Sequence, residues 1–153
     1  MDDAATVPRQ LGRTPRGPWR VAGRCSFGYP VCIATAPLIT NGERFPTLYY
    51  LTCPHIVAEV SRLESAGFME SVRAMLSADQ ALASRLLDAD ESYRKARANE
   101  GGGIDPTPEV GIAGQRDPLA VKCLHAHVAA YRAGIDDPVG ELVTAELIAE
   151  CGD

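Results

Sequence analysis

Hydrophobic and β-branched residues alternate with small or polar residues in three short segments early in the chain. These segments are 19–24, 30–36 and 47–52, and turn residues, including Asn41-Gly42, separate them. Consecutive strands joined by short turns are typical of an antiparallel meander. The third segment is the richest in aromatic and β-branched residues, which predicts that it is the central strand.

The hydrophobic period becomes helical from Pro54 onward. The predicted helices run from Pro54 to about Gly67, from Met69 to about Ala78, from Asp79 to about Gly101, from Pro118 to about Ala133 and from Pro138 to about Glu150. Residues 99–117 are rich in glycine and proline and predict a long loop, either functional or mobile. The pattern therefore predicts an α+β fold, with a small antiparallel sheet of about three strands covered on one face by four to five helices.

Length and charge suggest one domain with a distinct N-terminal arm. The chain has 153 residues and a net charge of −5, and we expect a single domain over 18–150. Residues 1–17 are rich in arginine and proline, and Pro8 and Pro15 are expected to interrupt any helix and leave a flexible arm. The first 24 residues carry five arginines and two aspartates, a balance of +3, which leaves −8 for the rest. An acidic body argues against general nucleic-acid binding, although the arm could contact RNA, an acidic protein partner or the body itself.

No segment approaches the roughly 20 apolar residues that a membrane span needs, and the first residues lack the apolar core of a signal peptide. These features predict a cytoplasmic protein without a membrane partner. In that compartment the five cysteines are expected to be reduced thiols, and an odd number fits a disulfide framework poorly.

Cys53 directly precedes Pro54, a residue favoured in the first turn of a helix. Cys53 is therefore the predicted N-cap, where unpaired N–H groups and the helix dipole would stabilise a thiolate. This placement suits metal binding or nucleophilic attack. The alternative is a small buried residue at a tight strand–helix junction.

A second group of candidate ligands lies near residue 123. In a helix from Pro118, Cys123 and His127 would be one turn apart on the same face and could hold a metal ion together. His125 would lie about 200° round from Cys123, which makes it the poorer ligand. The alternative is that both histidines border the core and bond to backbone or carboxylate groups.

Cys25, at the end of the first strand, completes a candidate Cys₃His metal site with Cys53, Cys123 and His127. Zinc is the default ion for sulfur and nitrogen ligands, with iron or an iron–sulfur cluster as the secondary alternatives. An open coordination position would permit metal-assisted hydrolysis, with a carboxylate such as Glu64 as a base.

Two other functions stay open at this stage, and with them the question of whether the protein is an enzyme. One is a thiol enzyme or redox sensor, with Cys53 as nucleophile and His127 or His55 as base. The other is a non-catalytic interaction module that uses the arm and the glycine-rich loop to bind a protein partner.

Longer motifs carry a resemblance to a known family. They are Arg24-Cys25-x-x-Gly28-x-Pro30, the run from Gly42 through Phe45 to Cys53-Pro54, Ser61-Arg62-Leu63-Glu64, and Val121 to His127 followed by Asp137-Pro138-Val139-Gly140. The sequence resembles a bacterial, mainly actinobacterial, family catalogued as domain of unknown function five-hundred-and-one. The resemblance implies a cytoplasmic protein linked by gene neighbourhood to cell division or polyphosphate metabolism, and its motifs contain Cys25, Cys53, Cys123, His125 and His127.

Overall fold

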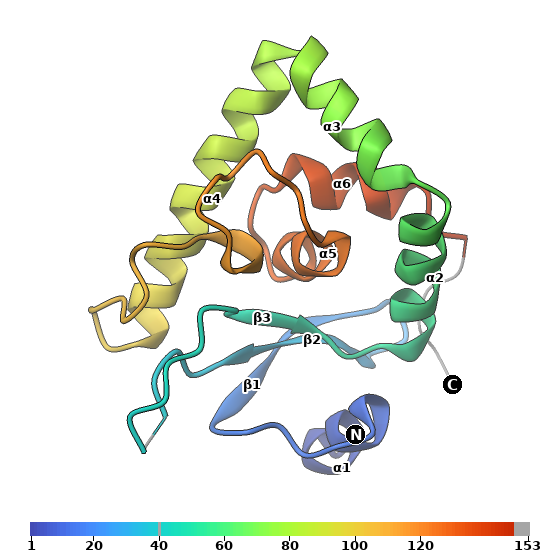
Figure 1. Cartoon of the computed structure of the whole chain (residues 1–153). Coiled ribbons are helices and arrows are strands. Elements are labelled where there is room, and N and C mark those ends of the chain that lie inside the picture. Colours follow the sequence, from blue (N-terminus) through green and yellow to red (C-terminus); the bar gives the residue numbers. More distant parts are fainter. Residues whose placement is uncertain (40, 149–153) are drawn as a thin grey trace.

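The computed structural model describes residues 1–39 and 41–148, and it confirms the predicted α+β fold (Figure 1). The elements in chain order are α1 (Asp3–Leu11), β1 (Trp19–Arg24), β2 (Pro30–Thr35), β3 (Tyr49–Leu51), α2 (Pro54–Ser65), α3 (Phe68–Ala78), α4 (Gln80–Glu100), the 3₁₀ turn η1 (Ile112–Gly114), α5 (Leu124–Arg132) and α6 (Pro138–Ala145).

The three strands form an antiparallel meander in the order β1-β2-β3. The prediction that the third strand is central is wrong, because β2 lies in the middle and β3 at one edge. β3 pairs with β2 through three residues, Tyr49, Tyr50 and Leu51. Its aromatic and aliphatic side chains reflect burial by the helices above it rather than a central position in the sheet.

The main core lies between one face of this sheet and the helices. Cys32 and Ala34 of β2 and Tyr49 and Leu51 of β3 belong to the buried cluster. Side chains two residues apart in a strand share a face, so these four point to the same side. α5 packs across that side, and the other long helices surround α5 (Figure 1).

The opposite face of the sheet is covered by α1, in a segment where the prolines were expected to interrupt any helix. That expectation is wrong, because Pro8 lies inside the helix, the Asp2 carboxylate accepts the Ala4 N–H at its start, and Gly12 ends it in the left-handed conformation. Val7 is fully buried and packs beneath the sheet. Burial of this apolar face compensates for the backbone bond that proline removes.

Capping residues set the start of most other helices, as the sequence predicts. Cys53 is the N-cap of α2, with Pro54 in its first turn. The Asp79 carboxylate accepts the N–H groups of Ala81 and Leu82 and begins α4. Asp137 begins α6 in the same way, and α6 ends at Ala145, five residues before the predicted end at Glu150, which lies outside the described residues.

α5 begins at Leu124, and the prediction that this helix starts at Pro118 is wrong. Asp117 does cap a turn, since its carboxylate accepts the Leu119 N–H at 3.0 Å. The helix does not continue because Val121 takes a left-handed conformation, with φ 46°. Cys123 is extended and acts as the N-cap of α5.

The loop after α4 is held in place by Arg97, whose side chain is fully buried. Its guanidinium bonds both carboxylate oxygens of Asp105, at 2.8 and 2.9 Å. It also donates to the carbonyl oxygens of Pro46 and Thr107. A buried charge is tolerated when it is paired and fully hydrogen-bonded, so this residue fixes the loop that leads towards Cys123.

Candidate functional site

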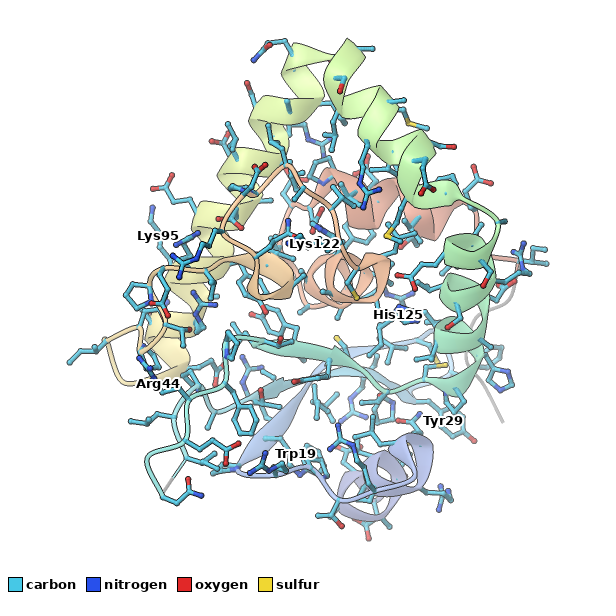
Figure 2. All side chains as sticks on the ribbon, in the orientation of Figure 1. Trp19, Tyr29, Arg44, Lys95, Lys122 and His125 are labelled. Carbon is cyan, nitrogen blue, oxygen red and sulfur yellow. The ribbon has the colours of Figure 1, made fainter. Side chains whose placement is uncertain are left out.

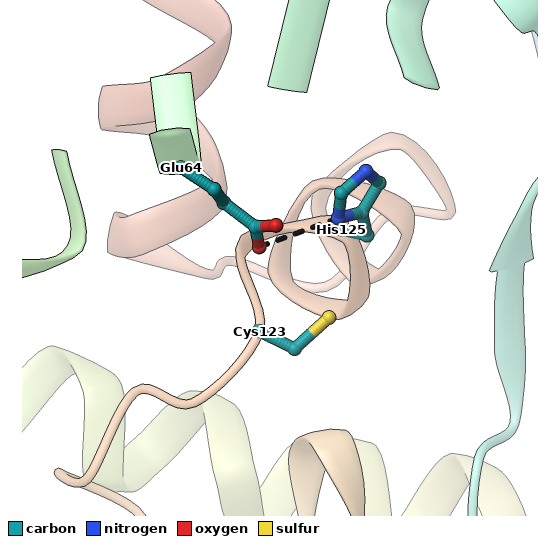
Figure 3. A group of neighbouring side chains, drawn as sticks. All are labelled: Glu64, Cys123 and His125. Carbon is teal, nitrogen blue, oxygen red and sulfur yellow. Dashed lines mark hydrogen bonds and ion pairs between the residues drawn. The ribbon is translucent and has the colours of Figure 1, made fainter. Parts of the chain in front are cut away.

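A cluster of three potential ligands lies where α2 meets the start of α5. The donor atoms of Glu64, Cys123 and His125 all lie within 4.8 Å of one another (Figure 3). It is the one group of three or more cysteine, histidine or acidic ligands within 1–39 and 41–148 that could hold a metal ion. Each side chain is partly exposed, so the cluster can be reached from solvent.

Glu64 projects from the last turn of α2 and joins the two elements. Its Oε2 accepts the N–H of Leu124 at 2.9 Å and lies 3.3 Å from Nδ1 of His125. The Leu124 N–H is one of the donors that the start of a helix leaves unpaired. A carboxylate there is also favoured by the positive end of the helix dipole, so Glu64 fixes the entry of α5.

His125 is in the first turn of α5 and has partners on both ring nitrogens. Nε2 lies 3.1 Å from the Ser61 hydroxyl and 3.4 Å from the Val57 carbonyl oxygen. A carbonyl oxygen can only accept, so this contact favours a hydrogen on Nε2. In the neutral ring that leaves a lone pair on Nδ1, facing the Glu64 carboxylate, so these two acceptors favour either a proton on Nδ1 or a metal ion between them.

Cys123 places its sulfur on the Nδ1 side of the His125 ring (Figure 3). Burial opposes ionisation of the thiol, but the hydrogen bond with His125 and the Ala126 N–H together lower the pKa of Cys123 below its ordinary value. The same contact with Cys123 raises the pKa of His125, burial opposes that rise, and the charge of Glu64 adds to it. Three donors thus converge on one point that favours positive charge.

Of the four ligands predicted from the sequence, this cluster contains Cys123 alone. Cys53 is a fully buried free thiol at the start of α2. Cys25 follows β1, is almost fully buried and takes part in a disulfide, which contradicts the prediction that all the cysteines are reduced. His127 is fully buried, and its Nδ1 lies 2.7 Å from a carboxylate oxygen of Asp137.

The interpretation that set His125 aside assumed that Cys123 lies within the helix. Cys123 is extended, with φ −152° and ψ 111°, so helical spacing does not apply between it and His125. Glu64 was considered only as a base acting on a bound metal. The Ser61-Arg62-Leu63-Glu64 motif is the sequence signal that marks this region, although nothing in it points to Cys123.

The fold and the site together define a small α+β protein with a partly exposed glutamate, cysteine and histidine cluster at a helix N-terminus. The family model described as "Protein of unknown function (DUF501)" matches residues 21–145, and the chain belongs to this family. The match includes all three cluster residues, whereas α1 lies before it.

No curated protein and no solved structure matches the chain. Among the described residues, no helix is both long and apolar enough to cross a membrane.

Proposed function

We propose that this protein binds a metal ion through Glu64, Cys123 and His125, and that the ion is zinc. The observation that carries the proposal is the orientation of His125. Its Nδ1 faces the Glu64 carboxylate at 3.3 Å, while its Nε2 lies 3.4 Å from the Val57 carbonyl oxygen. Metal-binding histidines characteristically donate their second N–H to a carbonyl or carboxylate, which fixes the ring and its tautomer.

The donor types fit zinc. A thiolate, an imidazole and a carboxylate are all ordinary zinc ligands, and mixed sulfur and nitrogen sets favour it over magnesium or calcium. Three protein ligands are the number found in catalytic zinc sites, where the fourth position holds water or substrate. The partial exposure of Glu64 and His125, 24% and 27% of their side chains, leaves room for such a fourth ligand.

Metal content of the full-length chain, purified without a histidine tag, tests the proposal. We expect about one zinc per chain, with most of it lost in Cys123→Ala, His125→Ala and Glu64→Gln. The exposed residues His55 and Glu70 supply matched controls, and His55→Ala and Glu70→Gln should retain the metal. Circular dichroism of each variant separates metal loss from unfolding.

The same experiment distinguishes this site from the Cys25, Cys53, Cys123 and His127 set predicted from the sequence. If Cys53→Ala and His127→Ala lose the metal while Glu64→Gln and His125→Ala keep it, the proposed ligands are wrong. A wild-type chain that takes up no zinc or iron after anaerobic reconstitution would exclude both sets.

A second candidate function is a thiol enzyme or redox sensor that uses Cys123 rather than Cys53. It is favoured by the position of Cys123 at the N-terminus of α5 and beside the His125 imidazole, a placement that activates cysteine nucleophiles. Metal-free protein would then show one thiol that iodoacetamide modifies much faster than the others near pH 7, and His125→Ala would abolish the difference. A protein partner bound by the arm and the glycine-rich loop stays a prediction, as does the link to cell division or polyphosphate metabolism that the resemblance implies.

A further inference from the structure

A cavity of about 290 Å³ lies on the α1 side of the sheet, opposite the face that α5 covers. Its floor is formed by Ile33 and Thr35 of β2 and Tyr50 of β3, which share that face of the sheet. Its walls are the chain segment 11–18, which starts at the last residue of α1, and part of the connection between β2 and β3. This volume is near the lower end of those seen for small-molecule sites.

The two walls meet at one end of the cavity. A Cβ atom at Gly17 would lie 2.5 Å from a methyl carbon of Ile39, so a larger residue at this position would displace the Ile39 side chain. The wall formed by 11–18 lies outside the part of the chain that the family model matches. The N-terminal wall of the cavity is therefore not part of the segment on which the family membership rests.

Two arginines supply the charge of this largely apolar cavity. Arg16 is paired with Glu43, and its guanidinium lies over the Phe45 ring, 5.4 Å from the centroid. Arg13 is exposed and makes no hydrogen bond or ion pair with any residue that the structure describes. No aspartate or glutamate of the described chain lines the cavity. One guanidinium thus stays available to an anion at the rim of an apolar space.

We propose that this cavity binds a small amphipathic monocarboxylate, with its hydrocarbon body on Ile33 and Tyr50 and its carboxylate on Arg13. A single unpaired guanidinium matches one carboxylate through two parallel N–H···O bonds. The apolar floor favours a hydrocarbon body over a sugar or a nucleotide, which would leave polar groups unpaired. The site is independent of the proposed metal function, because the sheet separates it from the Glu64–Cys123–His125 cluster.

Trp19 provides a natural reporter of binding. It is the only tryptophan in the chain and pairs directly with Thr35 across the β1–β2 ladder. Directly paired residues project to the same face, so Trp19 shares the face that carries the cavity floor. Figure 2 shows Trp19 on the α1 side of the sheet and His125 on the other side.

Titration of the full chain with octanoate, followed by Trp19 fluorescence and by calorimetry, tests the proposal. We expect saturable binding that Arg13→Glu weakens by about tenfold or more, since it replaces a charge-assisted hydrogen bond with repulsion. Arg9→Glu makes the same change of charge on an exposed residue of α1 that does not line the cavity. Screening should limit its effect to about threefold or less. Ala36→Trp, which fills the cavity from its wall, should abolish binding without lowering the melting temperature of the chain.

Three results would overturn the proposal. They are the absence of any saturable signal, equal weakening by Arg13→Glu and Arg9→Glu, and binding of octanol or octylamine as tight as that of octanoate. His125→Ala should bind octanoate like the wild type whether or not the chain holds a metal. Failure of this proposal is thus distinguishable from failure of the metal site.

Discussion

Asp137 joins two helices by using its two carboxylate oxygens differently. Oδ2 lies 2.7 Å from Nδ1 of His127 on α5, and Oδ1 accepts the N–H groups of Val139 and Gly140 at the start of α6. Both side chains of the His127–Asp137 pair are fully buried. Asp137 thus begins α6 and attaches it to α5 at the same point.

Asp137→Ala should lower the free energy of unfolding by about 3 kcal/mol, because it removes a cap and leaves a buried imidazole without its partner. Urea denaturation measures this. The matched control is Asp79→Ala, which removes an exposed cap with two similar bonds from α4 and should cost about 1 kcal/mol. Equal losses in the two variants would contradict the role assigned to His127.

Gly140→Ala should destabilise the chain although alanine is the better helix former. A Cβ at Gly140 would lie 2.3 Å from the His127 carbonyl oxygen and 2.4 Å from the Cβ of Tyr131. Overpacking between α5 and α6 should cost about 2 kcal/mol. Thermal denaturation measures the change. The control is Glu141→Ala, at the exposed neighbouring position, which should change the stability hardly at all. A more stable Gly140→Ala variant would mean that the two helices are not in close contact.

The ion pair of Arg97 and Asp105 should make the free energy of unfolding depend on pH in the acidic range. Burial opposes ionisation, but the hydrogen bonds from Arg97 and from the Thr107 N–H lower the pKa of Asp105 below its ordinary value of 3.8. A carboxyl with a lowered pKa in the folded state contributes stability above its unfolded pKa, and this contribution is lost as pH falls through the folded value.

Asp105→Asn should therefore cost about 3 kcal/mol at pH 7, where it leaves Arg97 buried without a counter-charge. The difference from wild type should shrink as the pH falls below 3.8, the ordinary value. Urea denaturation from pH 7 to pH 3 follows it, with the exposed substitution Asp88→Asn as the control. A difference that does not change with pH would show that Asp105 acts without its charge.

The free thiols should differ strongly in reactivity. Burial raises the pKa of Cys32 to about 12, and Cys53 is fully buried, whereas Cys123 is partly exposed and has a lowered pKa. Native metal-free protein at pH 8 should react with iodoacetamide at Cys123 first, as peptide mass spectrometry can show. Denatured protein should lose this order, and a native order led by Cys32 would contradict the burial described above.

The sequence by itself determined the features that depend on neighbouring residues. The hairpin strands β1 and β2, the proline at the start of α2, and the start of α4 at Asp79 all follow from turn, proline or capping signals carried by a few neighbouring residues. Such local signals act in the same way in almost any tertiary setting. For this reason the α+β class was predictable from the order in which strand-like and helical repeats of hydrophobic residues follow one another along the chain.

Only the tertiary structure decided the position of α1, the start of α5 and the members of the site. α1 forms in spite of Pro8 because the sheet buries Val7. α5 starts at Leu124 because Val121 turns the chain and Glu64 accepts the Leu124 N–H. Glu64 and Cys123 come from distant segments, and their approach depends on how α2 packs against α5. Packing of this kind is a property of the whole folded chain, so no local spacing encodes it.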